Sequence, residues 1–150
     1  MSYLLDTNHC IYLMNGWKKD ELKRSSHESS TIQKVLSLGD DAMLYLCEAT
    51  LGELYYGAEN SQRKEENRKS IAMLKQAVLP LVVDESVWEI FGTTKAILRR
   101  SGRRIPDLDL LIAATARSYG LCLITNDAHL ALLPDDFLRE NWAGYAAYPG

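Results

Sequence analysis

The stretch from position 105 to 127, IPDLDLLIAATARSYGLCLITND, constrains the fold of this chain more than any other. Residues 110–116 are apolar on nearly all sides of a helical turn, which predicts a buried helix. Residues 121–124 form an apolar run without alternation, the pattern of a strand that is covered on both faces. Asp109 lies in the first helical turn, and Asp127 follows the strand. Because such a helix packs on its own strand, we expect both acids at one edge of the domain.

The composition narrows the class of protein. With 150 residues, the chain is long enough for one domain with a proper core and too short for two ordinary ones. A formal net charge of −3 means that nucleic acid would have to be held by local patches or bound metal ions. Cys10, Cys47 and Cys122 lie among apolar residues and fit no zinc motif, so we interpret them as reduced core residues of a cytoplasmic protein. We see no signal peptide and no membrane-spanning run.

Apolar strands alternate with helices along the chain, which predicts an α/β domain with a parallel sheet. We expect strands at 3–5, 43–47, 79–83 and 121–124, an edge strand near 139–142, and helices at 9–15, 32–38, 49–58, 62–77, 85–100 and 109–119. Gly16 and Gly120 are expected to end helices. The polar segment 17–31 is either a solvated excursion or the tip of a helical hairpin, and 143–150 reads as a loose tail of the single domain 1–150.

Acidic side chains gather where the predicted strands end. Asp6, Glu48, Asp84 and Asp127 each directly follow a strand, and Glu53 lies one and a half turns into the next helix. In parallel sheets, sites form outside the carboxyl ends of the strands, at the point where strand order reverses. We therefore expect most of these acids at one edge of the sheet.

A cluster of Asp6, Glu53, Asp109 and Asp127 needs a cation. Two carboxylates about 4 Å apart repel by roughly 4 kcal/mol at a surface-like dielectric constant. No Lys or Arg is adjacent to any of the four in the sequence. Mg²⁺ or Mn²⁺ is the simpler partner, because both prefer carboxylate and water oxygens. Such an ion promotes phosphodiester hydrolysis. We expect the nearby polar residues Thr7, Asn8, Thr125 and Asn126 to support the ligands.

Four segments that carry these acids resemble the motifs of a known family. LLDTN (4–8), TLGELYYGA (50–58), DLLIAATA (109–116) and LITND (123–127) are similar, in this order, to the acidic motifs of PIN-domain nucleases, in particular VapC-type toxins. The resemblance implies a three-layer α/β/α fold with strand order 3-2-1-4-5 and Mg²⁺- or Mn²⁺-dependent endoribonuclease activity. It also implies a homodimer that is inhibited by a small antitoxin, and it matches Asp6, Glu53, Asp109 and Asp127 to the family's four acids.

Other polar residues near the motifs have two interpretations. For Asp107 we favour a helix cap over a metal ligand, and likewise a cap for Asp84, whereas Glu48 is open between a supporting contact and the surface. The arginine cluster is either a solvated helix end or an RNA-phosphate contact; it consists of Arg99, Arg100, Arg103 and Arg104. Lys18, Lys19, Lys23 and Arg24 of segment 17–31 have the same two readings. His9, His27 and His129 show no partner pattern, and we expect them on the surface or on helices.

Three other functions compete with a toxin ribonuclease. A structure-specific DNA nuclease would need a longer clamp region than this chain offers. A non-catalytic Mg²⁺-binding regulatory domain would need a phosphate-accepting Asp and a Lys after a later strand, and no such Lys follows Asp84 or Asp127. A catalytically inactive scaffold of the same fold is disfavoured by the four intact acids. An antitoxin is expected to place a basic side chain, most suitably Arg, into the acidic pocket.

Overall fold

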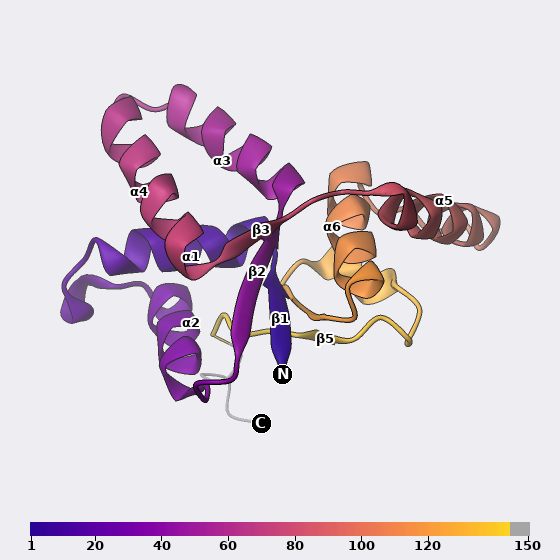
Figure 1. Cartoon of the computed structure of the whole chain (residues 1–150), viewed down its shortest axis with the longest axis horizontal. Coiled ribbons are helices and arrows are strands. Elements are labelled where there is room, and N and C mark those ends of the chain that lie inside the picture. The colour runs from indigo at the N-terminus through magenta and orange to yellow at the C-terminus, as the bar shows by residue number, and fades with distance from the viewer. Residues whose placement is uncertain (145–150) are drawn as a thin grey trace.

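Five parallel strands form one sheet with the order β3-β2-β1-β4-β5 (Figure 1). The structure is a computed structural model that describes residues 1–144. The strands are β1 (Ser2–Leu5), β2 (Met43–Cys47), β3 (Leu79–Leu81), β4 (Cys122–Ile124) and β5 (Arg139–Glu140). The predicted strand order is confirmed. In the centre of the sheet, Leu5 pairs with Leu46 on one side and with Ile124 on the other, so β1, β2 and β4 end side by side.

Within residues 1–144, six helices connect and cover the strands. They are α1 (Thr7–Trp17), α2 (Ser26–Ser37), α3 (Glu48–Glu59), α4 (Lys64–Ala77), α5 (Glu85–Arg100) and α6 (Asp107–Ser118), with 3₁₀ turns at Glu21–Lys23 and Ala128–Leu132. None of the helices within residues 1–144 has both the length and the apolar character to cross a bilayer.

The core lies on both faces of the sheet, because successive strand residues point to opposite sides. Leu5 and Ile124 pack in one cluster with side chains of α1, α2, α3 and α4. Leu4 and Leu123 pack in the other cluster with α5 and α6. This is the expected three-layer arrangement, and Figure 1 shows α1, α2 and α4 apart from α5 and α6. Both clusters include predicted core cysteines, and all three cysteines are buried and free.

Helix α6 is buried on nearly every side, as its sequence predicts. All residues from Leu110 to Ala116 are buried between the sheet, α3 and α5. The helix ends where Gly120 adopts a positive φ of 68°, and the N–H of Leu121 then donates to the carbonyl of Ala116. A left-handed residue after the last turn satisfies carbonyls that the helix leaves open. This short reversal sends the chain directly into β4.

The polar segment 17–31 is the tip of a helical hairpin rather than a solvated excursion. Helix α2 begins at Ser26, six residues before the predicted start, behind a capping box made by Ser25 and Glu28. Glu28 is only 5% exposed, and its carboxylate also binds the ammonium of Lys19 at 2.9 Å. Hydrogen bonds and a cation thus compensate the burial of a charge that the composition suggested was solvated.

Two further expectations need correction, one about the end of helix α1 and one about the start of the C-terminal tail. Gly16 does not end α1; it lies within the last turn, where a Cβ atom would meet Cδ1 of Ile32 at 2.5 Å. The glycine therefore serves the close approach of α1 to α2. The tail predicted from residue 143 is not loose at its start, because Ala143 is buried and its N–H donates to Oδ1 of Asn141. The remainder of that tail lies outside the described residues.

Candidate metal centre

Asp6 is held at the end of the central strand. Its backbone N–H donates to the carbonyl of Ile124 at 2.9 Å, which extends the pairing of β1 with β4 by one step. Its Oδ1 accepts from the backbone N–H of His9 at 2.9 Å, so the carboxylate caps α1. The imidazole Nδ1 of His9 is 2.8 Å from the same oxygen. Asp6 is therefore both a helix cap and a buried carboxylate at the expected edge of the sheet.

Glu53 is attached to the start of α1 by a hydroxyl group. The Oγ1 atom of Thr7 donates a short hydrogen bond to the Glu53 carboxylate and lies 3.2 Å from Oγ1 of Thr50. Glu53 and Thr50 both belong to α3, which follows β2. Thr7 directly follows Asp6 in the chain, so this contact brings the second acidic motif to the first.

Asp109 and Asp127 lie together where α6 begins and β4 ends. One potential ligand atom from each of Asp109, Asp127 and His129 can be chosen so that all three lie within 4.8 Å of one another. Burial, and then the charge of Asp127, raise the pKa of Asp109 to about 6. Burial would also raise the pKa of Asp127, but hydrogen bonds from the backbone and the ring of His129 hold it below its ordinary value. The two neighbouring carboxylates are thus affected in opposite directions, with the pKa of Asp109 raised and that of Asp127 lowered.

The four acids reach the carboxyl edge of the sheet in two pairs, Asp6 with Glu53 and Asp109 with Asp127; among residues 1–144, only Asp109, Asp127 and His129 place potential ligand atoms within 4.8 Å of one another. Asp6 is joined to Glu53 through Thr7, and the charge of Glu53 contributes to the raised pKa of Asp109. The charge of Asp127 raises that pKa more than the charge of Glu53 does, so Asp127 is the acid that affects Asp109 most. The elements that bring them together are the parallel pairing of β1 with β4 and the packing of α3 against α1 and α6.

The chemistry of this group suits a hard divalent cation. Its donors are carboxylate oxygens with a hydroxyl close by, which are the ligands that Mg²⁺ and Mn²⁺ prefer. The raised pKa of Asp109 reflects burial first and then the negative charges of Asp127 and Glu53, which a bound cation would compensate. Divalent metal use, which the acidic motifs imply, is thus consistent with the residues at this edge.

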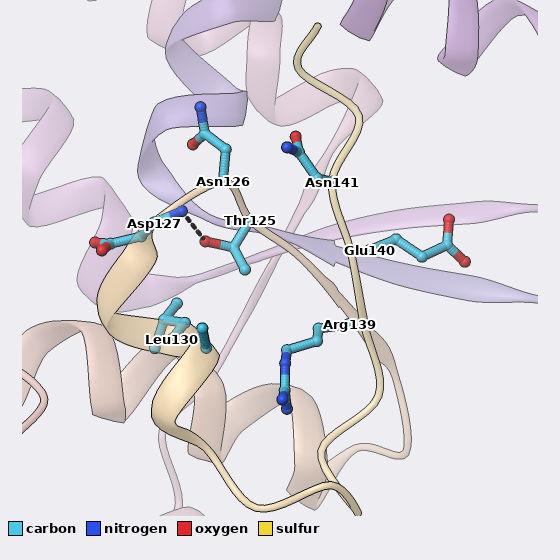
Figure 2. A pocket seen from close by; sticks show the side chains of 8 residues that line it. Thr125, Asn126, Asp127, Leu130, Arg139, Glu140 and Asn141 are labelled. Carbon is cyan, nitrogen blue, oxygen red and sulfur yellow. Dashed lines mark hydrogen bonds between the residues drawn. The ribbon is translucent and has the colours of Figure 1, made fainter. Parts of the chain in front are cut away.

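A cavity of about 270 Å³ opens beside Asp127, between β4, β5 and the turn at Ala128–Leu132 (Figure 2). Its lining residues are Thr125, Asn126, Asp127, Leu130, Ala131, Arg139, Glu140 and Asn141. Thr125 Oγ1 accepts from the backbone N–H of Asp127, and Nδ2 of Asn126 donates to Oη of Tyr12. Both residues thus fix the local chain beside the acids. Asn8, the remaining predicted supporting residue, is exposed.

Of the two predicted helix caps, the one at Asp84 is confirmed and the one at Asp107 is wrong. Asp84 caps α5, because its Oδ1 accepts from the N–H of Val87 at 3.1 Å. Asp107 is not the cap of α6: the helix begins at Asp107 itself, after Pro106, and the Asp107 carboxylate pairs with Lys95 at 3.0 Å. Glu48 is exposed and accepts from the N–H of Val83, so it fixes the chain just after β3.

The arginine cluster is exposed at the end of α5 and in the loop before α6. Within residues 1–144, none of its four members forms an ion pair with the four acids. Two histidines were missed as neighbours of the acids. His9 is 0% exposed and His129 binds Asp127. A capping carboxylate can bind a side chain in the turn that it caps. His9 follows Asp6 by three residues and His129 follows Asp127 by two, and this spacing is the sequence signal that could have identified them.

The chain is similar to known proteins over nearly its whole length. Residues 3–135 match the family model of the PIN domain. The tRNA(fMet)-specific endonuclease VapC of Shigella flexneri is 29% identical over 143 residues, covering 95% of this chain and 99% of that protein. Ribonuclease VapC2 of Haemophilus influenzae is 30% identical over 142 residues, covering 95% and 98%.

Solved structures agree with this assignment. One solved structure is that of VapBC2 from Rickettsia felis bound to a DNA fragment from the VapBC2 promoter. A chain of it superposes with a TM-score of 0.81 at 26% identity, covering 95% of this chain and 99% of that one. A chain of the VapBC-1 structure from nontypeable Haemophilus influenzae gives a TM-score of 0.79 at 30% identity, covering 95% and 98%. The acidic edge, the strand order and these likenesses agree: the chain belongs to the PIN-domain family.

Proposed function

We propose that this protein is a metal-dependent endoribonuclease and the toxin of a toxin–antitoxin pair, built as a single PIN domain and acting in the cytoplasm. The observation that carries the proposal is the placement of the acids at the carboxyl edge of the sheet, with Asp109 beside Asp127 and Glu53 held by Thr7 next to Asp6. Relatives of matching length that are named ribonucleases favour RNA as the substrate over DNA. No observation favours a non-catalytic regulatory domain.

The four acids would hold Mg²⁺ or Mn²⁺, with Thr7 orienting Glu53 and Thr125 fixing the backbone of Asp127. When bound, such an ion neutralises charge on the phosphoryl group and activates a water. His129 would hold Asp127 in place through two hydrogen bonds to Oδ1. The chain's own contribution is therefore a set of carboxylates whose positions are fixed before substrate binds.

The RNA would cross the acidic edge between two features of the surface. The cavity beside Asp127 is lined by the amide side chains of Asn126 and Asn141 and by the apolar Leu130, which suit a nucleotide next to the cleaved bond. The Arg139 guanidinium in its wall already donates to backbone carbonyls. The arginine cluster would bind phosphates, so Arg103→Gln with Arg104→Gln should weaken RNA binding and reduce its salt dependence.

The proposal is tested by cleavage of defined RNA, including tRNA, by the purified chain. Chelation should abolish cleavage, and adding back Mg²⁺ or Mn²⁺ should restore it. Asp109→Asn protein prepared in parallel controls for contaminating ribonuclease, because it should copurify with any contaminant yet remain inactive. Cleavage that persists after exhaustive chelation and repurification would exclude the metal mechanism.

The proposed antitoxin would bind a groove between α1, α3 and α4. A cavity of about 140 Å³ there is lined by the apolar side chains of Ile11, Met14, Leu54, Ala58 and Ile71, and Glu53 is part of its wall. An amphipathic segment fits such a groove, and an Arg next to it would reach the acids.

Inhibition should weaken as Mg²⁺ rises, because Arg and metal compete for the same oxygens. Inhibition that is insensitive to Mg²⁺ would mean that the antitoxin only blocks RNA entry.

A further inference from the structure

The imidazole of His9 connects the candidate metal centre to the far end of the chain. It is fully buried, with Nδ1 2.8 Å from Oδ1 of Asp6. On the other side of the ring, Nε2 lies 3.3 Å from the backbone nitrogen of Trp142. Trp142 lies outside residues 3–135, which match the family model.

These two contacts fix the protonation of the ring. The backbone N–H of Trp142 can only donate, so Nε2 must present its lone pair and carry no hydrogen. The one hydrogen of the neutral ring is therefore on Nδ1, where it points to Asp6. Within residues 1–144, both hydrogen bonds that the Asp6 carboxylate accepts are at Oδ1. The rotation of that carboxylate is thereby restricted, and Oδ2 is left for another partner.

The segment around Trp142 is held rigidly enough to act as a support. Its carbonyl accepts from Oγ of Ser30 at 2.8 Å, and its indole N–H donates to Oε1 of Glu140 at 3.0 Å. Its ring packs edge-on against Tyr3 of β1 with centroids 4.8 Å apart. Contacts to α2, β5 and β1 thus keep the Trp142 N–H in front of His9.

We propose that His9 is a positioning residue for Asp6: its Nδ1-protonated ring, held in that tautomer by the Trp142 N–H, orients the Asp6 carboxylate to hold the cation. This inference rests on the proposed function, since Asp6 must be a metal ligand. Residues that orient ligands in this way are worth about 10–100-fold in metal affinity. A purely structural His9 would affect stability and leave the affinity of the folded protein unchanged.

The first test observes the tautomer directly. Long-range ¹H–¹⁵N spectra of the full chain labelled at histidine, recorded without metal, should show an unprotonated Nε2 and a protonated Nδ1 for His9. The half-buried His27 and the exposed His129 provide comparison signals in the same spectrum. A His9 ring protonated at Nε2, or one that averages between tautomers, would overturn the inference.

The second test separates the two contacts with matched variants, using Mn²⁺ binding in the absence of RNA. In His9→Asn the amide nitrogen replaces Nδ1 and keeps the donor to Asp6. In His9→Gln the amide reaches the Nε2 position and keeps only the contact with Trp142. We expect His9→Gln to weaken Mn²⁺ binding about 10–100-fold and His9→Asn to stay within a few-fold of the parent. Equal losses in both variants, or parent affinity in folded His9→Gln, would contradict a positioning role.

A third variant keeps the inference testable if His9→Gln fails to fold. Ser30→Ala with Thr31→Val removes the two hydroxyls that bind the Trp142 carbonyl. We expect the His9 tautomer to lose its preference and Mn²⁺ affinity to fall several-fold; an altered tautomer with unchanged affinity would overturn the inference. If the parent binds no Mn²⁺ and cleaves no RNA, the proposed function itself fails. If the parent binds Mn²⁺ and the variants bind it equally well, only the role of His9 fails.

Discussion

The acids near the sheet edge differ in what surrounds each carboxylate. Asp84 accepts a helix N–H, and the exposed Asp107 pairs with the half-buried Lys95, so both acids lie at the surface with partners of their own. Asp109 lies two residues further on, partly buried and close to Asp127 and Glu53. A spacing of two residues on a helix places two side chains on different faces. The environment of each acid therefore decides its role more than its position in the motif.

Asp109→Asn should be severe for catalysis, whereas Asp107→Asn should be mild. Removing the Asp109 carboxylate should reduce turnover by more than the roughly 100-fold that the loss of a supporting residue can cost. Asp107→Asn removes only an exposed ion pair, which is worth about 0–1 kcal/mol in stability, and should leave turnover within a few-fold of the parent. Single-turnover cleavage of one RNA at saturating Mg²⁺ measures both. A reversed ranking would mean that Asp107 is the ligand.

The stability of the metal-free protein should depend on pH through Asp109. Its pKa of about 6 in the folded protein lies above the ordinary 3.8, so between these values the folded state binds more protons than the unfolded state. Stability due to this group therefore rises as pH falls through that window. Asp109→Asn should melt at a higher temperature than the parent above pH 7, and the difference should shrink towards pH 4. A difference independent of pH would show that burial and the neighbouring charges do not raise the pKa of Asp109.

Pairs of elements meet through contacts that local patterns do not describe. Helix α1 passes close to α2 at Gly16, and the approach lets Lys19 and Glu28 pair across the hairpin. The same hairpin supplies Ser30, which binds the carbonyl of Trp142 beside His9. The packing of α1 on α2 therefore supports the position of Asp6 as well as the fold.

Gly16→Ala should destabilise the protein although Ala favours helices. The new methyl group would lie 2.5 Å from Cδ1 of the buried Ile32, and overpacking costs about 1–3 kcal/mol. Gly92→Ala is the matched control: it is exposed within α5 with open space around it, and should stabilise by about 0.5–1 kcal/mol. Urea denaturation measures both. In an Ile32→Val background, which lacks Cδ1, the cost of Gly16→Ala should largely disappear; a cost that persists would locate the clash elsewhere.

At the scale of the whole molecule, many apolar side chains remain exposed, including one pair on α3 and α4 and another pair after β3 and on α5. Tyr56 of α3 and Met73 of α4 are 71% and 63% exposed. Val82, after β3, and Trp88 of α5 are 61% and 51% exposed. Exposed apolar side chains that cluster on helices indicate interaction surfaces when they form a continuous patch. Tyr56 and Met73 lie on α3 and α4, the two helices through which we predict self-association.

The protein should be a dimer in solution through α3 and α4. Light scattering at tens of micromolar should give twice the chain mass for the parent, and Tyr56→Ser with Met73→Ser should give a monomer. Val82→Ser with Trp88→Ser removes a comparable exposed apolar surface at a different site and should remain dimeric. Dissociation by this second pair alone would place the interface on the β3–α5 surface.

Much of the architecture follows from local sequence patterns. Unalternating apolar runs specify buried strands, and the residues after them are at the carboxyl edge of any parallel sheet, whatever its details. For this reason Asp6 and Asp127 could be assigned to that edge, and the apolar sequence of 110–116 predicted a helix buried on all sides. Asp6 also showed why competing interpretations need not exclude each other, because it caps α1 and remains a candidate ligand.

Only the tertiary structure decided which distant groups meet. His9 is 133 residues from its partner Trp142, and no periodicity encodes such a contact. Glu28 looked solvated because its neighbours in sequence are polar, whereas its burial depends on Lys19 and on the approach of α1 to α2. The local sequence suggested that Gly16 ends a helix. The reason for a glycine at this position is instead the close approach of Ile32, which belongs to another helix. Local patterns report the residues that a side chain has beside it in the chain, and packing chooses those it meets in space.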